Sequence, residues 1–401
     1  MTEDGVPGAP AFPMPRTCPF SPPREYAELR AARPLSRVTL QDGNTAWLAT
    51  SHEYVRTLLG HPATSANRAH PGFPATVANV QAFAQKGFLL SMDQPEHSLH
   101  RRMVAAEFTV HRIRQLRPRI QQIVDDRIDA LLAIGTRPVD LVRELALPVP
   151  SLVICELLGV PYGSREVFQG HTEVLLARAS TPQQRQESFG ALRAFLGDLV
   201  SSKDGNPDDD LLGRLSVKYR AADCYDHELL TGFAMLLLLA GHETTASMIS
   251  LGLLALLRDE RLATQLTDDP TLTPNAVEEL LRYFSIVDYP TARVALADID
   301  LGADRVRAGE GFVASAAAAN HDGDVFADPG TIDFRRGVRG HVAFGYGVHQ
   351  CLGQNLARAE LEIVYDTVLA RLPAMKLLTS PEEQPFKEAT VYGLHSLEVT
   401  W

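Results

Sequence analysis

Residues 344–353 read Phe-Gly-Tyr-Gly-Val-His-Gln-Cys-Leu-Gly and are the most informative stretch of the chain. They place one thiol among three glycines, directly before an amphipathic run at 354–369 that predicts a helix. Backbone N–H groups and the helix dipole can hold such a thiol as thiolate, and the glycines let a large flat ligand approach the backbone. The loop therefore suits a thiolate ligand to a haem iron, although a single cysteine is more commonly a buried structural residue.

Composition indicates a globular protein that can bury a sizeable core: the chain has 401 residues, of which 45% are hydrophobic and 22% charged. A net charge of -11 argues against general nucleic-acid binding, which needs a basic surface. The N-terminal residues are acidic and do not read as a secretory signal, so we expect a cytoplasmic protein. No C-x-x-C spacing suggests a zinc site or a disulfide framework among the four cysteines, Cys18, Cys155, Cys224 and Cys351.

The most apolar stretch, 229–257, contains His242 and Glu243 and therefore predicts a central buried helix rather than a membrane span. Asp42-Gly43-Asn44 between two short apolar runs predicts a hairpin. We expect one mainly α domain over residues 1–401, with small β-sheets and a flexible N-terminus at 1–15. The predicted helices are 24–32, 114–134, 139–158, 164–178, 183–202, 227–258 and 275–283, and short strands are predicted within 292–315.

The spacing Phe-x-x-Gly-x-x-x-Cys-x-Gly, carried by Phe344, Gly347, Cys351 and Gly353, resembles the haem-binding signature of cytochromes P450. The resemblance implies that Cys351 ligates the iron of haem b and that Phe344 contacts the cofactor. It also implies the fold of that family, a helical triangular prism with small β-sheets. It looks closest to the soluble bacterial members and spans roughly residues 15–401.

A second motif lies at the middle of the apolar helix, where Gly241-His242-Glu243-Thr244-Thr245 follows Ala240. Gly241 and the threonine hydroxyls predict a local kink or bulge that could hold water or dioxygen. The segment resembles the family's Ala-Gly-x-[Glu/Asp]-Thr motif, in which Glu243 and Thr244 would be the catalytic proton source and relay. Ala246 stands where a zinc H-E-x-x-H motif needs its second histidine, which excludes that reading.

A third motif is Glu279-x-x-Arg282, whose side chains share a helix face. Alone it is a weak signal, because exposed ion pairs contribute only about 0–1 kcal/mol. It resembles the Glu-x-x-Arg signature of cytochromes P450, which implies a buried pair joined by a later arginine. Arg336 is the best match for that arginine and Arg335 the alternative, and the three would support the cysteine loop.

A haem carries two carboxylates, and burying them requires cationic partners. Four residues match positions that contact the propionates in soluble bacterial members, although each alone reads as a surface charge. His100 and Arg102 are expected to point away from the cofactor, and His341 is a weaker candidate. The four are His97, Arg101, Arg293 and His349.

Six arginines and one acid, Glu107, lie between His97 and Arg119 of an otherwise acidic chain. Such a run is as compatible with a solvated face as with docking of an acidic electron-transfer protein. The chain has no room for a flavin or iron–sulfur module. The resemblance therefore implies that electrons from NAD(P)H arrive through a ferredoxin and its ferredoxin reductase.

The resemblance implies monooxygenation, in which one atom of O₂ is inserted into a C–H bond by hydroxylation or epoxidation. The substrate expected from the family is a bulky hydrophobic secondary metabolite, such as a polyketide or macrolide, a terpenoid or a steroid. We further expect a monomer that contacts neither membrane nor nucleic acid. The segments expected around the substrate are 71–90, 175–189, 286–289 and 390–392, and the individual pocket residues are Leu237, Ala240, Val287 and Val391.

Other functions remain open at this stage. A haem-thiolate peroxygenase or a non-enzymatic haem sensor would share the cysteine loop but would not need Glu243 and Thr244. A hydrolase built on Cys351 and His349 lacks an evident orienting partner. A dinucleotide-binding loop is excluded, because the third glycine falls at 353 and breaks the G-x-G-x-x-G spacing.

Overall fold

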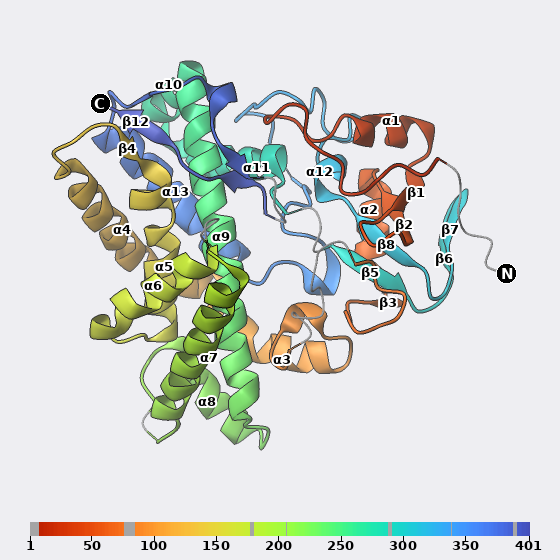
Figure 1. Ribbon diagram of the computed structural model, residues 1–401, viewed down its shortest axis with the longest axis horizontal. Helices are drawn as coiled ribbons and strands as arrows, with labels where there is room; N and C mark the ends of the chain where they lie inside the picture. Colours follow the sequence, from red (N-terminus) through yellow and green to blue (C-terminus); the bar gives the residue numbers. More distant parts are fainter. Residues whose placement is uncertain are drawn as a thin grey trace.

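A helical layer and a β-rich layer lie side by side in the computed structural model, with helix α9 running between them (Figure 1). The structure describes residues 8–75, 85–176, 180–205, 207–287, 291–337, 339–387 and 391–401. Its α-helices are α1 (Glu25–Ala32), α2 (His52–Gly60), α3 (Glu96–Ala105), α4 (Val110–Leu132), α5 (Pro148–Leu158), α6 (Arg165–Leu176), α7 (Pro182–Gly205), α8 (Leu211–Ala221), α9 (His227–Arg258), α10 (Glu260–Asp268), α11 (Thr273–Phe284), α12 (Ala316–Ala319) and α13 (Gln354–Arg371).

The β-layer is a five-stranded sheet in the order β1-β2-β8-β5-β3. Strands β1 and β2 form the predicted hairpin, and β2 then pairs parallel with β8. Three smaller sheets pair β6 with β7, β10 with β11, and β12 with both β4 and β9. The strands are β1 (Leu35–Thr39), β2 (Thr45–Ala49), β3 (Thr64–Ser65), β4 (Val139–Asp140), β5 (Ala292–Ala295), β6 (Ile299–Leu301), β7 (Asp304–Val306), β8 (Gly311–Ala314), β9 (Lys376–Leu377), β10 (Phe386–Lys387), β11 (Gly393–Leu394) and β12 (Glu398–Thr400).

Helix α9 is buried along most of its length, as its apolar sequence predicts. The side chain of Asp226 caps its N-terminus by accepting a hydrogen bond from the Leu229 N–H at 2.9 Å. By length and composition α9 is the one helix in the described part of the chain that could cross a membrane. Within its most apolar 18-residue window, 61% is buried inside the protein, as in the core helix of a folded domain.

The kink or bulge predicted at Gly241–Thr245 of α9 is wrong, and a π-helical turn lies instead before α5. The structure describes α9 in full, and it stays α-helical through Gly241–Thr245, with no widened turn. The helix predicted at 139–158 is instead strand β4, a π-helical turn at Val142–Ala146 and helix α5. Pro148 explains the break, because its ring removes an N–H and restricts the residue before it.

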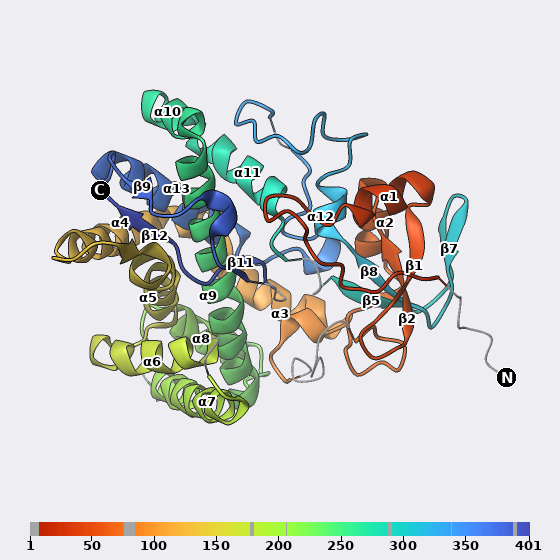
Figure 2. The ribbon, with the colours of Figure 1, turned by 45° about the horizontal axis from the view of Figure 1, so that its top comes forward.

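The N-terminal segment was expected to be flexible over residues 1–15. Residues 1–7 lie outside the described part of the chain. After them, Phe12 and Met14 are buried against the β-layer, and the Phe12 N–H donates to the Thr39 carbonyl at 2.8 Å. Helix α3 and the cysteine loop lie where the two layers meet, and this arrangement persists in the rotated view (Figure 2).

Candidate active site

The motifs that the sequence singled out converge on one internal cavity of about 330 Å³. Helix α9 contributes one wall and the cysteine loop contributes another. Helix α3 and strand β5 bring the charged groups, although each lies far from the loop in sequence. The predicted residues that line the cavity are His97, Arg101, Leu237, Ala240, Thr244, Val287, Arg293, Phe344, His349 and Cys351.

The cysteine loop is a folded turn held by its own backbone. The Cys351 N–H donates to the Phe344 carbonyl at 2.8 Å, and the Gly345 N–H donates to the Val342 carbonyl at 2.9 Å. Gly347 has a φ of +75°, and a Cβ there would lie 2.4 Å from the Leu59 carbonyl oxygen of α2. Only glycine fits this contact, so Gly347 allows the loop to pack directly against the backbone of α2.

Cys351 is exposed to the cavity that it lines, and the cavity itself is enclosed by protein atoms. Burial raises the pKa of the thiol. The backbone N–H of Gly353, the charges of Arg101 and Arg358, and the backbone N–H of Gln354 act in the opposite direction. Donors and positive charges therefore converge on the sulfur, and these are the groups that stabilise a thiolate.

The charged residues form a compact group beside the cysteine loop. The rings of His97 and His349 lie 4.0 Å apart between centroids. Burial first, and then the nearby Arg101 and Arg293, lower the pKa of His97 to about 4. Burial and the same neighbours lower the pKa of His349 to about 2, so both imidazoles are neutral at pH 7.

This group carries excess positive charge. Burial lowers the pKa of Arg293 to about 10, which leaves the guanidinium charged at neutral pH. Arg101 donates to the Gln350 carbonyl. Among the residues that the structure describes, His97 Nε2 has no hydrogen-bond partner. One end of the apolar cavity therefore suits an anionic group. It offers two arginines and a buried imidazole nitrogen that is unsatisfied.

Three neighbouring residues point elsewhere. His100 Nδ1 and the Tyr219 hydroxyl lie 2.9 Å apart, and Arg102 is exposed, so both lie off the cavity as expected. His341 does not line the cavity either, and its Nε2 donates to Glu278 at 2.9 Å. The candidacy of His341 as a cofactor contact was therefore wrong, because that nitrogen is already used by a carboxylate.

Glu243 and Thr244 lie on different sides of α9. Thr244 lines the cavity, and its hydroxyl donates to the Ala240 carbonyl at 2.6 Å. Glu243 is absent from the described lining residues, and its Oε1 lies 3.6 Å from Lys387 Nζ on β10. The alcohol therefore faces the cavity, while the acid faces a lysine that the sequence analysis did not select.

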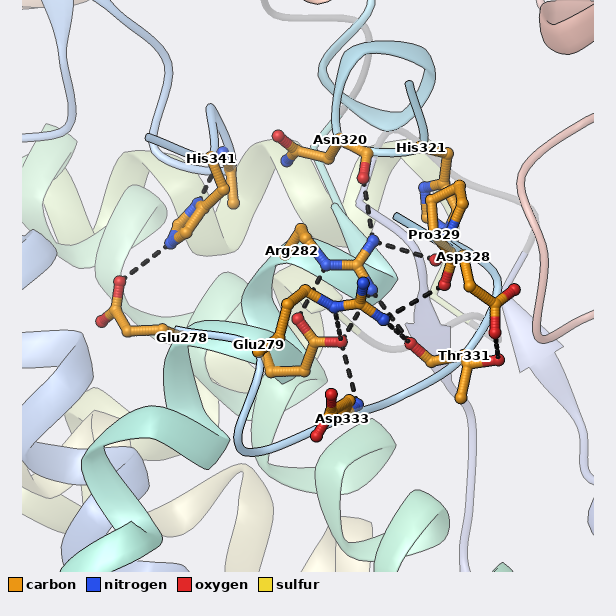
Figure 3. A network of polar contacts seen from close by, with 12 residues as sticks. Glu278, Glu279, Arg282, Asn320, His321, Asp328, Pro329, Thr331, Asp333 and His341 are labelled. Atoms are coloured by element: carbon orange, nitrogen blue, oxygen red, sulfur yellow. Dashed lines mark hydrogen bonds and ion pairs between the residues drawn. The ribbon is translucent and has the colours of Figure 1, made fainter. Parts of the chain in front are cut away.

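The predicted contacts of Glu279 are all present (Figure 3). Glu279 and Arg282 are fully buried, with Arg282 Nε donating to Oε2 and Nη2 to Oε1, both at 2.8 Å. Arg336 Nε donates to Oε1 at 3.1 Å, whereas the alternative, Arg335, is exposed. Arg282 Nη1 also donates to the Asn320 and Pro329 carbonyls at 2.9 Å, which ties α11 to the segment before the cysteine loop.

Comparison with known proteins decides the family. The family model Cytochrome P450 matches residues 208–394. Pentalenic acid synthase of Streptomyces avermitilis is 45% identical, covering 100% of each chain. Vitamin D3 dihydroxylase of Streptomyces griseolus is 44% identical over 98% of this chain and 97% of its own.

The chain belongs to the cytochrome P450 family. The crystal structure of cytochrome P450 MoxA from Nonomuraea recticatena agrees, with a TM-score of 0.94, 47% identity and 98% coverage of both chains. The mainly α P450 fold is thereby confirmed, and so is the activity of a monooxygenase with haem b as cofactor. Its electrons come ultimately from NAD(P)H through partner proteins.

The residues present fit the P450 cofactor. A haem has an apolar macrocycle, two propionates and an iron that accepts a thiolate. The cavity offers apolar walls, the arginines and unsatisfied imidazole described above, and the sulfur of Cys351.

Sequence reasoning missed two buried ionisable residues of the P450 cavity. Glu360 on α13 is only 2% exposed, and burial raises the pKa of its carboxyl to about 8. Its Oε2 has no hydrogen-bond partner within the described ranges. Arg68 also lines the cavity, and burial lowers its pKa to about 10. A signal for Glu360 existed, since it shares the inward, apolar helix face with Leu356 and Val364.

One predicted pocket residue lies beyond the described lining. Val391 is not among the residues that line the cavity and instead forms an isolated β-bridge with Val287. Leu89, Leu90 and Ile286 from the predicted segments do line it. The parts of those segments at 76–84, 177–179, 288–289 and 390 lie outside the described residues.

The basic cluster of this P450 is partly internal. Arg117 Nη1 pairs with Glu362 at 2.6 Å, and Arg119 Nε pairs with Glu156 at 3.1 Å. Arg101 faces the cavity. Only part of the run is therefore available to a partner, chiefly the exposed Arg102 and Arg114.

Proposed function

We propose that this monooxygenase oxidises a bulky, largely apolar secondary metabolite of the polyketide or macrolide, terpenoid or steroid class. The apolar lining of the cavity carries the proposal. Away from its charged end, the walls come from Leu89, Val104, Phe233, Leu237, Met248, Ile286 and Val287. Such walls reward apolar surface and give few directional contacts to small polar molecules. The compounds in the names of the relatives, pentalenic acid as a product and vitamin D3 as a substrate, are in line with this class.

Each predicted site residue receives a role in this proposal. Cys351 would hold the iron through its sulfur, with Phe344 beside it. His97, Arg101, Arg293 and His349 would hold the propionates. When bound, the haem supplies oxygen activation and transfer of one oxygen atom to the substrate.

The protein would bind and orient the substrate, exclude water and deliver protons. Leu237, Ala240 and Val287 line the wall expected to face the substrate, and Val391 would support that wall through its bridge to Val287. Thr244 Oγ1 would move protons into the cavity. Glu243 would supply them from the Lys387 side, which requires its carboxyl group to rotate away from that lysine.

We further propose that a ferredoxin and its reductase deliver the electrons to a monomeric enzyme in the cytoplasm. The exposed arginines of the basic cluster support this, because an acidic partner is attracted to positive charge close to the cysteine loop. The supporting residues Glu279, Arg282 and Arg336 would keep that loop in place while the partner docks.

One spectrum tests the haem assignment. The reduced protein with carbon monoxide should show the strongly red-shifted Soret band of a thiolate-ligated haem, and Cys351→Ala should abolish it. A Soret band like that of a histidine-ligated globin would contradict the assignment of Cys351. Titrating the ferric enzyme with a library from the three substrate classes, and with small polar controls, then tests the substrate class through the spin-state change.

A further inference from the structure

Two adjacent glutamates on α11 hold different parts of the molecule. Figure 3 shows Glu279 directed at Arg282 and Glu278 directed at His341. Glu278 Oε2 accepts from His341 Nε2 at 2.9 Å and from Arg358 Nη2 at 3.0 Å, and Arg358 Nε donates to Oε1. We call Glu278, His341 and Arg358 the Glu278 clasp. It joins α11, the segment before the cysteine loop, and α13.

The charges of the Glu278 clasp are fixed by its hydrogen bonds. Burial acts to raise the pKa of Glu278, but the hydrogen bonds from His341 and Arg358 lower it to about 2, so the carboxylate is charged at neutral pH. His341 Nδ1 accepts from the Ala343 N–H at 3.2 Å. His341 Nε2 therefore donates to Glu278. The carboxylate of Glu278 also faces the positive charge of Arg358.

Arg358 connects the clasp to the sulfur. Its guanidinium carbon lies 4.6 Å from the centroid of the Phe344 ring. The carbonyl of Phe344 accepts the N–H of Cys351 at 2.8 Å. Arg358 is also one of two cationic side chains, with Arg101, whose charge acts to lower the pKa of Cys351. The charge of Arg358 therefore acts on the sulfur, and the carboxylate of Glu278, which is paired with Arg358, offsets that charge.

We propose that Glu278 is a positioning residue that tunes electron donation by the Cys351 sulfur, because it fixes Arg358 against Phe344 and offsets its charge. The inference rests on the proposed role of Cys351 as the iron ligand. A net positive charge near the thiolate stabilises electron density on sulfur and weakens its donation to iron. The reduction potential of the haem then becomes more positive. A net negative charge has the opposite effect.

The two partners of the clasp should therefore shift the potential in opposite directions. Glu278→Gln keeps the side-chain shape and leaves Arg358 uncompensated, so the potential of the haem-loaded enzyme should become more positive. Arg358→Gln leaves Glu278 uncompensated, so the potential should become more negative. The double variant should lie between them, near the wild-type value. Spectroelectrochemical titration measures all three, alongside the Soret position of the reduced carbon monoxide complex.

A second ion pair on α13 provides the matched control. Arg117 and Glu362 form a similar contact between α4 and α13, without the stacking on Phe344 that Arg358 has. Arg117→Gln and Glu362→Gln should leave the potential unchanged. A loss of stability common to both pairs would not produce shifts of opposite sign.

The outcomes distinguish a failure of the inference about Glu278 from a failure of the assignment of Cys351 as the iron ligand. Shifts of the same sign in the two clasp variants, or no shift, together with an intact thiolate Soret band, overturn the inference alone. If Glu278→Gln does not fold, Arg358→Gln decides, since a zero or positive shift overturns the inference. A wild-type enzyme without a thiolate Soret band overturns the assignment of Cys351 and the inference together.

Discussion

Glu360 is a carboxylic acid kept neutral by its surroundings. Its pKa of about 8 lies above the ordinary value of 4.5, so the folded protein retains a proton that the unfolded chain has released. The stabilisation from this proton is complete below about pH 4.5 and is lost as the pH rises through about 8. The cause is burial without a cation to compensate the charge.

Glu360→Gln removes this titration while keeping a side chain of the same shape. The stability of the variant relative to wild type should therefore increase between about pH 5 and about pH 8. Urea unfolding of the haem-loaded proteins at several pH values measures the difference. If the unfolding free energies of wild type and variant changed with pH in parallel, Glu360 would already be ionised in the folded protein. Glu362→Gln, two residues further along α13, is the matched control for the loss of a carboxyl group, because Glu362 is paired with Arg117.

Thr244 lines the cavity, and its hydroxyl donates to the Ala240 carbonyl. Thr244→Ala should lower the fraction of consumed NAD(P)H that appears as oxidised product several-fold, because a positioned proton donor is lost. Thr244→Ser should recover most of the coupling, since it keeps the oxygen. Equal coupling in the alanine variant and in wild type would remove Thr244 from proton delivery.

Among the elements, α11 supports the cysteine loop through both of its adjacent carboxylates. Glu279 accepts from Arg282, Arg336 and the Asp333 N–H, so it fixes the chain that leads to the loop. Arg336 adds bonds to the carbonyls of residues 327, 328 and 331. The segment therefore depends on side chains, because it has little regular secondary structure of its own.

Arg336→Leu should destabilise the protein by about 1–3 kcal/mol, since it removes a cationic hydrogen-bond donor from the buried Glu279 carboxylate. Haem loss on heating should begin at a lower temperature as a result. Arg335→Leu is the matched control, because Arg335 is exposed and contributes only its backbone N–H to Asp333. Thermal unfolding followed at the Soret band compares them. If both variants lost haem at the same temperature, the contact between Arg336 and Glu279 would not support the loop.

The accuracy of the sequence predictions differs between elements for a physical reason. Helix α9 was predicted with the bounds that the structure has, because Asp226 caps it and its interior is apolar on every side. The π-helical turn before α5 was missed, because its residues have a helical pattern and only the backbone registers the extra residue. Thr244 and Cys351, which lie inside motifs, line the cavity, whereas their motif neighbour Glu243 does not. Glu243–Lys387 and Glu278–Arg358 were missed, since partners so distant in sequence leave no spacing to read.

At the scale of the molecule, the protein is acidic overall but carries positive charge next to the cysteine loop. The exposed arginines of the basic cluster belong to α3, whose Arg101 donates to the Gln350 carbonyl of that loop, and to α4, which packs on α13. An acidic partner is therefore repelled by most of the surface and attracted by this part of it. Such steering acts mainly on the association rate and weakens with salt.

Arg102→Glu combined with Arg114→Glu should raise the ferredoxin concentration needed for half-maximal turnover about tenfold, and should flatten its salt dependence. Substrate-induced spin-state changes should be unaffected. Arg24→Glu, at the N-cap of α1 beside the β-layer (Figure 1), is the charge-matched control for each single variant, Arg102→Glu or Arg114→Glu. Steady-state kinetics at several salt concentrations provide the measurement. An equal effect of the control would mean that only net charge matters.

The contact between Gly347 and the Leu59 carbonyl also constrains which sequences can replace this one. At position 347 even a methyl group would collide with the backbone of α2, so a saturation library sorted for haem incorporation should return glycine alone. At the next residue, Val348, the side chain is 53% exposed and should accept polar replacements freely. Tolerance to mutation would thus change from none to nearly complete within one peptide bond.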